Sequence, residues 1–319
     1  MDSATRKLSS RLMSTPFQHA LLIANPIAGA GRGEKEGMGL RDALEQAGLS
    51  VELKLTSGAG DACRFAAERV GDVDLIVAVG GDGTLREILN GLHEGVDEAR
   101  DTPAVATMPM GTANVLALDF KLPRLIPGIV EMIRGGATRM IDLARIEKDG
   151  ETQSTSFLAI GAGLDADIVH RLGAARTGPI SKLSYIPHVT RALVKFKPPA
   201  LTITVDGKTL DGTFGQILIA NIINYGGILK LDPKTESDDG LWELYLWRKG
   251  NRRELTRSAI RGAVAHLPGG PCSRIRAKKV HISSAVPVPY HVDGDPGGFT
   301  PFEFEVTGRR QAILVPRSE

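Results

Sequence analysis

The chain has 319 residues, which is more than one ordinary domain and predicts two. Hydrophobic residues make up 42% and charged residues 24% of the sequence, so wholesale disorder is excluded. Lys and Arg number 39 against 37 Asp and Glu, and the resulting net charge of +2 predicts no nucleic-acid partner.

Residues 1–19 contain no apolar segment of the kind found in signal peptides, so we interpret them as a mobile N-terminal arm. Between 20 and 136, short apolar runs alternate with segments of helical spacing. Fully apolar strands separated by helices are typical of a parallel sheet covered on both faces, so we predict an α/β domain over 20–136. The predicted strands are 21–24, 51–55, 75–79 and 104–107, and the predicted helices are 40–47, 62–70 and 85–92.

The pattern changes after about residue 137. Strands joined by turns are typical of an antiparallel sandwich or barrel, and Asp206-Gly207 predicts a hairpin turn. We therefore predict a β-rich domain over 137–307, from which residues 308–319 could return to the first domain. The predicted strands are 201–205, 216–223, 241–247, 279–283, 288–292 and 302–306, and the predicted helices are 165–172, 182–194 and 251–265.

A glycine-rich loop follows the first predicted strand. Gly29, Gly31 and Gly33 come after Asn25-Pro26 and before a helix, where main-chain N–H groups and the helix dipole favour phosphate. The spacing matches neither the dinucleotide fingerprint nor the Walker loop, so a flexible glycine turn is the alternative.

The sharpest motif is Gly80-Gly81-Asp82-Gly83-Thr84, which follows a buried strand and begins a helix. Its glycines allow a substrate to approach the backbone, and Asp82 lies at the carboxyl edge of the sheet, where ligands bind in open parallel sheets. A carboxylate beside bound phosphates holds Mg²⁺ or accepts a proton. The alternative is a simple helix cap.

The third motif, Pro109-Met110-Gly111-Thr112-Ala113-Asn114, follows the next strand and begins a short helical run. Gly111 permits close approach, and Thr112 and Asn114 supply neutral hydrogen-bonding groups. The second and third motifs could therefore face one phosphate chain across a crevice, unless Thr112 or Asn114 only caps the helix.

These motifs resemble, in their order, those of the diacylglycerol-kinase-type lipid kinases, which include bacterial diacylglycerol kinases and the sphingosine and ceramide kinases. Asp232-Pro233 with Asp238-Asp239-Gly240-Leu241 is similar to the family's downstream acidic motif, and 292–295 to its terminal Asp-Gly-Glu. The resemblance covers residues 20–316. It implies a NAD kinase/diacylglycerol kinase-like α/β nucleotide-binding domain, a β-sandwich domain for the lipid acceptor, and ATP in the cleft between them.

The resemblance also implies roles for particular residues. Asp82 would organise the catalytic Mg²⁺, and Asp239 would hold a second Mg²⁺ together with the carbonyl groups of Glu236 and Leu241. The residues that would contact the nucleotide are Asn25, Gly29, Gly31, Gly33, Thr56, Gly81, Asp82, Gly83, Thr84, Glu87, Gly111, Thr112 and Asn114.

Asp293-Gly294-Asp295 matches the pair of acids from which the family's general base is drawn. Phosphoryl transfer to an alcohol needs positioning, neutralisation of charge by a metal, and one carboxylate that accepts the hydroxyl proton. One of these two carboxylates could orient the acceptor while the other takes the proton. An ordinary turn between strands is the alternative interpretation.

Two positions depart from the family pattern. The family commonly has Glu where this chain has Asp295, and the missing methylene shortens the reach of the carboxylate by about 1.5 Å, a scale at which rate is lost. Many members have Asp where this chain has Val115. Asp119, one helical turn further on, is a candidate to supply the missing carboxylate.

We therefore predict an ATP- and Mg²⁺-dependent kinase that phosphorylates a lipid hydroxyl at the inner face of the cytoplasmic membrane, with the apolar 157–194 segment lining the acceptor site. Diacylglycerol, another glycerolipid, a sphingoid base and ceramide all stay open as acceptors. Two alternatives are a non-catalytic regulatory member that binds lipid or nucleotide, and a soluble kinase of NAD or a sugar phosphate.

The cysteines and the length of the apolar runs indicate where in the cell the protein is found. Cys63 and Cys272 lie far apart and predict neither a disulfide framework nor a metal cluster, so a reducing cytoplasm is the simplest compartment. The apolar stretches have the length of strands and are far shorter than the about 20 residues that a membrane helix needs. We therefore expect membrane association to be peripheral.

A basic helix is predicted near the end of the second domain. Arg253, Arg257 and Arg261 share one of its faces, which is either a solvated face or a contact with an anionic membrane surface. His281 and His291 fall in predicted strands without metal-ligand spacing and are expected to be structural. Whether the chain forms a homodimer stays open.

Overall fold

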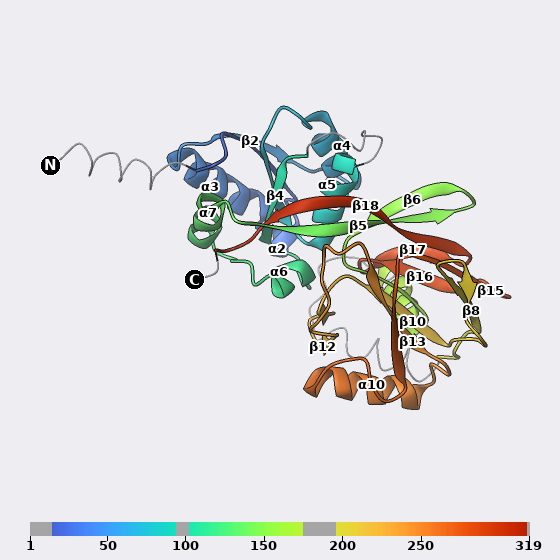
Figure 1. Cartoon of the computed structure of the whole chain (residues 1–319). Coiled ribbons are helices and arrows are strands. Elements are labelled where there is room, and N and C mark those ends of the chain that lie inside the picture. The colour runs from blue at the N-terminus through green and yellow to red at the C-terminus, as the bar shows by residue number, and fades with distance from the viewer. Residues whose placement is uncertain (1–14, 94–101, 175–195, 318–319) are drawn as a thin grey trace. The chain divides into compact units, whose positions relative to one another are not determined.

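The computed structural model describes residues 15–93, 102–174 and 196–317. The chain divides into two compact units, the first made of Met1–Met140 with Gln311–Glu319 and the second of Ile141–Arg310. The polypeptide therefore leaves the first unit once and returns to it at the end (Figure 1). Most of the predicted arm 1–19 and the predicted helix 182–194 lie outside the described residues.

A parallel sheet forms the centre of the first unit, as the alternating pattern predicts. Its strands follow the order β2 (Ser50–Leu55), β1 (His19–Ala24), β3 (Leu75–Gly80) and β4 (Ala104–Pro109). Every residue of β3 is buried, which is typical of a parallel strand covered on both faces. The end of β18 (Phe302–Leu314) lies beside β4, where Ile313 pairs in parallel with Val105.

Helices cover this sheet in packed pairs. α3 (Gly33–Gln46) packs against α7 (Ile126–Gly135), and α4 (Asp61–Glu68) packs against α5 (Asp82–His93). Leu40 and Leu44 of α3 are fully buried because they lie one turn apart on the face that meets the strands. The short helices α2 (Ala28–Gly31) and α6 (Val115–Asp119) belong to the loops after β1 and β4.

The second unit is a β-sandwich. One sheet is antiparallel, in the order β14 (Cys272–Ala277), β13 (Trp242–Trp247), β10 (Gln216–Ala220), β7 (Ala159–Ala162), β16 (Pro289–Val292) and β17 (Asp295–Phe299). The other includes the first part of β18 with β15 (Lys279–Ser284), β8 (Leu201–Val205) and β9 (Lys208–Thr209), while β5 (Thr138–Lys148) pairs with β18 and with β6 (Glu151–Ser156). Asp206 and Gly207 both have positive φ, 46° and 84°, as the predicted two-residue hairpin turn requires.

Aromatic and aliphatic side chains from both sheets fill the sandwich. The rings of Trp242 and Phe304 lie 5.1 Å apart, and those of Tyr290 and Phe302 stack at 4.0 Å. Each fully buried phenylalanine contributes about 1.5–3 kcal/mol to folding. The unit also contains α8 (Leu164–Ala174), α10 (Arg252–Val264) and the hairpin of β11 (Asn224–Tyr225) and β12 (Leu229–Lys230). No helix among the described residues is long and apolar enough to span a bilayer.

Candidate active site

Three loops meet at the carboxyl edge of the parallel sheet in the first unit. Asn25, directly after β1, donates its main-chain N–H to the carbonyl of Val79 (3.0 Å). Met110, directly after β4, donates to the carbonyl of Gly80 (2.7 Å) and accepts from the N–H of Gly29 (3.0 Å). The three motifs that the sequence singles out are therefore joined by main-chain hydrogen bonds.

Glycines allow the second and third loops to approach closely. A Cβ atom on Gly111 would lie 2.6 Å from Cα of Gly81, and one on Gly81 would lie 3.0 Å from Cα of Gly111. Asn114 closes the third loop, because Oδ1 accepts from the N–H of Gly111 and Nδ2 donates to its carbonyl, both at 2.7 Å. The Asn114 side chain is thus used within its own loop, and the residue adopts the left-handed conformation (φ 49°) that Asn tolerates.

Asp82 connects the second loop to the third. It is the first residue of α5, and its Oδ2 accepts a hydrogen bond from the N–H of Val115 at 2.9 Å. Val115 is the first residue of α6, whose N-cap residue, Asn114, makes no side-chain capping bond. The half-buried carboxylate of Asp82 therefore stabilises the start of α6, where negative charge is favourable.

The backbone of the first glycine loop packs closely against the residues that follow β1. A Cβ atom on Gly33 would overlap the carbonyl oxygen of Asn25, and the N–H of Gly33 donates to the carbonyl of Pro26 (3.2 Å). Gly29 and Gly31 have φ values of 61° and 85°, which glycine adopts at no steric cost. Gly33 thus fixes the backbone of this loop, while Gly31 lies exposed on its surface.

Other predicted nucleotide contacts have different surroundings. Gly83 and Thr112 are exposed at the loops. Thr84 is buried, and its side chain packs so tightly on Gly80 that a Cβ atom there would overlap Oγ1. Of these residues, Gly83 and Thr112 are thus the accessible ones.

Two further predicted contacts make protein-internal bonds. Oε2 of Glu87 accepts from the N–H of Ala62 (3.2 Å) at the start of α4, so this carboxylate caps a helix. Thr56, directly after β2, donates its N–H to the carbonyl of Ala24 (2.9 Å). Asp119 is the half-buried last residue of α6, and its compensating role stays a prediction.

In the second unit, Asp293 and Asp295 differ in their surroundings. Asp293 has positive φ (51°) in the turn between β16 and β17. Its carboxylate accepts hydrogen bonds from Oγ of Ser156 and from the main-chain N–H groups of residues 157–159, at 2.7–3.2 Å. Three of these bonds go to Oδ1 and one, from Phe157, goes to Oδ2. Asp293 therefore organises the 156–159 segment, and Asp295, half-buried at the start of β17, is the better candidate for a general base.

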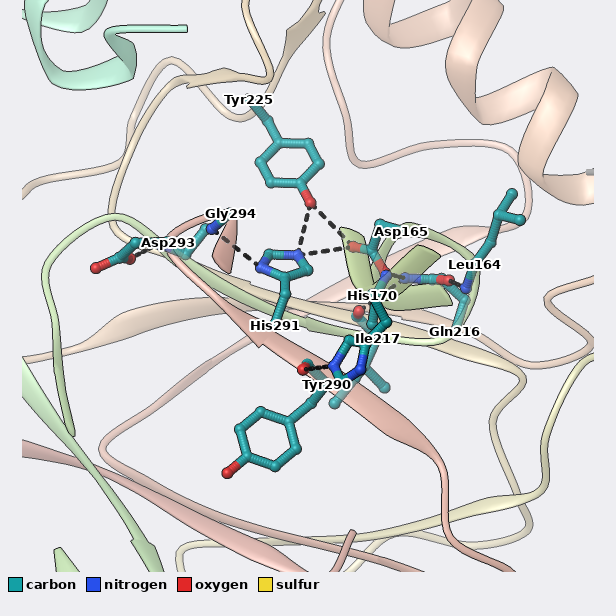
Figure 2. A network of polar contacts seen from close by, with 12 residues as sticks. Leu164, Asp165, His170, Gln216, Ile217, Tyr225, Tyr290, His291, Asp293 and Gly294 are labelled. Carbon is teal, nitrogen blue, oxygen red and sulfur yellow. Dashed lines mark hydrogen bonds and ion pairs between the residues drawn. The ribbon is translucent and has the colours of Figure 1, made fainter. Parts of the chain in front are cut away.

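A polar network lies beside that turn (Figure 2). The hydroxyl of Tyr225 donates to Oδ2 of Asp165 (3.0 Å) and lies 2.9 Å from Nε2 of His291. Nε2 of His291 is also 3.3 Å from Oδ2 of Asp165, whose Oδ1 accepts from Nε2 of Gln216 (2.8 Å). Nδ1 of His291 lies 3.4 Å from the main-chain N–H of Gly294, which donates to it. The network thus links the start of α8 to the turn between β16 and β17.

Burial and hydrogen bonding act in opposite directions on Asp165. Burial alone would raise its pKa, but hydrogen bonds from His291 and Gln216 hold the pKa of Asp165 below its ordinary value. Gly161 leaves the necessary space, because a Cβ atom there would overlap Oδ2 of Asp165. The sequence did not single out Gln216 or Tyr225, since they reach the network from separate strands and no local pattern marks them.

The acidic motif of the second unit is engaged with an arginine. Oδ2 of Asp239 pairs with the guanidinium of Arg276, and Oδ1 accepts from the N–H of Leu241 (3.1 Å). Glu236 is exposed. Across the described parts of the chain, no group of three or more His, Cys, Asp or Glu side chains is placed to hold a metal ion. The Mg²⁺ site predicted at Asp239 with the carbonyl groups of Glu236 and Leu241 stays a prediction.

Asp142 supports the same motif, although the sequence did not single it out. It is fully buried, and its Oδ2 accepts from the N–H of Gly240 (2.5 Å). Its Oδ1 accepts from Nε of Arg310 (2.9 Å), which offsets the cost of burying the charge. Asp142 belongs to β5, a strand that the sequence pattern did not predict.

The segment expected to line the acceptor site, 157–194, is described only as far as residue 174. Phe157 and Leu158 are buried, β7 follows, and α8 begins at Leu164. The remainder of the expected lining lies outside the described residues.

The fold and the motif order define the class of protein: an α/β domain with glycine-rich loops at its carboxyl edge, followed by a β-sandwich domain. Residues 19–146 match the family model described as the diacylglycerol kinase catalytic domain. Residues 158–315 match the model described as the YegS C-terminal NAD kinase beta sandwich-like domain. The chain belongs to the diacylglycerol kinase family.

Relatives match over nearly their whole length. A diacylglycerol kinase of Bacillus subtilis (strain 168) is 28% identical over 309 residues, which cover 95% of this chain and 98% of the relative. One from Staphylococcus epidermidis is 29% identical, with coverages of 94% and 93%. The crystal structure of a diacylglycerol kinase from Bacillus anthracis str. Sterne superposes with a TM-score of 0.71 at 21% identity, over 95% of this chain and 98% of that one. At this identity, the structural match shows a shared fold.

Proposed function

We propose that this protein is an ATP- and Mg²⁺-dependent lipid kinase that transfers the γ-phosphoryl group of ATP to the hydroxyl of diacylglycerol or a related lipid. The observation that carries the proposal is Asp82, a carboxylate fixed among glycine loops at the carboxyl edge of a parallel sheet. Relatives that carry the name diacylglycerol kinase over the full length of the chain support the same activity.

The donor set fits one Mg²⁺ ion that arrives with the nucleotide. In such sites Mg²⁺ is held by one or two carboxylates together with substrate phosphates, and Asp82 offers one carboxylate beside the exposed Gly83 and Thr112. Bound there, the ion would neutralise charge on the transferred phosphoryl group.

Groups of the protein itself would bind the phosphates and accept the proton. Main-chain N–H groups at the start of α5 would bind phosphate oxygens, because those of Gly29, Gly31 and Gly33 in the first loop already donate to carbonyl groups of the protein. Asp295 would accept the proton of the lipid hydroxyl, while Asp293 keeps its turn in shape through the bonds to residues 156–159. We place the reaction at the inner face of the cytoplasmic membrane, where such lipids are found.

The test is ATP consumption and lipid phosphorylation in mixed micelles with Mg²⁺, with diacylglycerol, phosphatidylglycerol, ceramide and sphingosine as acceptors and NAD as a soluble control. We expect one lipid to be phosphorylated by the wild type and not by Asp82→Asn. Asp211→Asn, an exposed aspartate of the second unit, is the matched control and should retain full turnover.

Other outcomes would point to the alternatives. ATP binding without phosphorylation of any lipid would overturn the proposal in favour of a regulatory protein. Phosphorylation of NAD alone would assign a soluble nucleotide kinase instead.

A further inference from the structure

α10 is anchored to the second unit by one face only. Ser258 and Gly262 are buried, and Nε1 of Trp247 in β13 donates to Oγ of Ser258 (2.7 Å). Leu229 of β12 packs on Gly262, where a Cβ atom would lie 3.1 Å from its side chain. Figure 1 shows the helix lying along one end of the unit. Its opposite face points away from these anchoring contacts.

That opposite face carries two arginines and two aliphatic residues, which we call the α10 stripe: Arg253, Arg257, Ile260 and Val264. They follow the i, i+4, i+7, i+11 spacing of one helix face, and all four are exposed. Ile260 is 60% and Val264 is 78% exposed. Isolated exposed aliphatic residues are ordinary, but two of them in line with two arginines form an amphipathic pattern typical of helices at a membrane surface.

The charges on α10 are strongly one-sided. Its only acidic residue, Glu254, accepts from the N–H groups of Lys249 (3.2 Å) and Gly250 (3.0 Å), so its carboxylate is turned to the start of the helix. Arg261, which the sequence placed on the same face, instead donates through Nε to the carbonyl of His266 (3.1 Å). Within the described residues, Arg253 and Arg257 form no salt bridge, so the positive charge of the stripe is available to a partner.

We propose that the α10 stripe is the surface with which the protein binds an anionic phospholipid bilayer. The two arginines contact lipid phosphates, and Ile260 and Val264 enter the boundary between headgroups and acyl chains. A second copy of the chain fits this surface poorly, because the stripe offers no acidic partner for the arginines of the other copy. The purpose of such binding rests on the proposed function, since a lipid acceptor has to be reached in its bilayer.

The experiment is co-sedimentation of the full chain, without ATP, with vesicles of phosphatidylglycerol and phosphatidylcholine in equal amounts. We expect binding that weakens as salt is raised. The double variant Arg253→Gln/Arg257→Gln should bind about 30-fold more weakly, because each arginine contributes about 1 kcal/mol and a factor of ten is about 1.4 kcal/mol. Ile260→Ser/Val264→Ser should bind at least about tenfold more weakly through lost apolar burial.

The matched control removes two exposed positive charges elsewhere, Arg124→Gln/Lys208→Gln, and should bind like the wild type. Circular dichroism checks that every variant is folded. Equal vesicle binding by the wild type and the arginine variant would overturn the proposal, and so would equally tight binding to vesicles of phosphatidylcholine alone. A wild-type dimer that Ile260→Ser/Val264→Ser converts to a monomer, with unchanged vesicle binding, would assign the stripe to self-association.

Vesicle binding and lipid phosphorylation are separate readouts. In detergent micelles the stripe variants should keep wild-type turnover, because none of the four residues belongs to the proposed active site. Vesicle binding as expected, with no lipid phosphorylated, would remove the proposed function and leave the bilayer contact in place. The converse result would remove only the bilayer contact.

Discussion

The carboxylate of Asp82 accepts a hydrogen bond from the main-chain N–H of Val115, 2.9 Å away and 33 positions further along the chain. The residue that the proposed chemistry needs at the edge of the sheet therefore also holds the third loop beside the second. The side chain of Asn114 does not cap the start of α6, because it is hydrogen-bonded to the main chain of Gly111. Asp82 accepts the hydrogen bond from Val115 instead. Substitutions of Asp82 consequently have to be designed so that the two tasks are separated.

Asp82→Asn and Asp82→Ala make that separation. The amide oxygen of Asn can still accept from Val115, so we expect the free energy of unfolding to change by less than about 1 kcal/mol while lipid kinase turnover falls at least about 100-fold. Asp82→Ala loses the acceptor as well and should cost a further about 1–2 kcal/mol. Urea unfolding and turnover are measured on both variants. Equal stability of the two would contradict the capping of α6.

Gly111→Ala should be more harmful than Gly81→Ala. Each added methyl group is directed at the facing loop, but the Cβ distance is 2.6 Å in the first case and 3.0 Å in the second. We expect Gly111→Ala to cost about 1–3 kcal/mol of unfolding free energy and to weaken ATP binding. Gly58→Ala is the control, because the space around Gly58 is open. Urea titrations with nucleotide-binding measurements check the order, and a reversed order would contradict the close approach of the loops.

Removal of the carboxylate charge should affect mainly stability at Asp293 and mainly turnover at Asp295. Asp293→Ala leaves the hydroxyl of Ser156 and the N–H groups of residues 157–159 without their acceptor, so we expect a loss of about 3 kcal/mol or more in unfolding free energy. Asp295→Asn, whose amide oxygen can still accept a hydrogen bond, should cost less unfolding free energy than Asp293→Ala but abolish turnover. Thermal unfolding and the micelle assay are run on both, and full turnover in Asp295→Asn would exclude it as the base.

The Asp165 network predicts a pH-dependent stability. Because the pKa of folded Asp165 is below its ordinary value of 3.8, ionised Asp165 contributes stability above that value, and the contribution is lost as the pH falls through the lower, folded pKa. Asp165→Asn should therefore cost about 1–3 kcal/mol at neutral pH. The difference from the wild type should shrink in acid. Urea unfolding across this pH range measures it, and a difference that grows in acid would contradict the assignment.

The sequence predicted those strands and turns that are determined by their own consecutive residues. The apolar run of β3 and the positive-φ pair Asp206-Gly207 carry their own signals, so both were predicted from the sequence alone. β5 was not predicted, because residues such as Ala144, Arg145 and Glu147 favour helices in isolation. It forms a strand since it pairs with β6 and β18, and the latter lies at the other end of the chain.

The same difference separates the parts of the candidate site. A glycine-rich loop can be recognised from a few consecutive residues of the sequence. The pairing of Asp239 with Arg276, in contrast, depends on the register between β13 and β14. Gln216 and Tyr225 lie 51 and 60 positions along the chain from Asp165, which they contact. Side chains brought together only by strand pairing leave no pattern that a single sequence can display.

The position of β18 beside β4 has a consequence for biosynthesis. Because Ile313 pairs with Val105, the sheet of the first unit keeps an open edge at β4 until the segment around Ile313 has been synthesised. Exposed strand edges invite pairing with other chains, so the nascent protein passes through a stage at which it needs protection from aggregation. The second unit is continuous in sequence from Ile141 to Arg310 and can complete its fold first. Most of the first unit is thus translated before the second, but its sheet is completed only by residues that follow the second unit in the sequence.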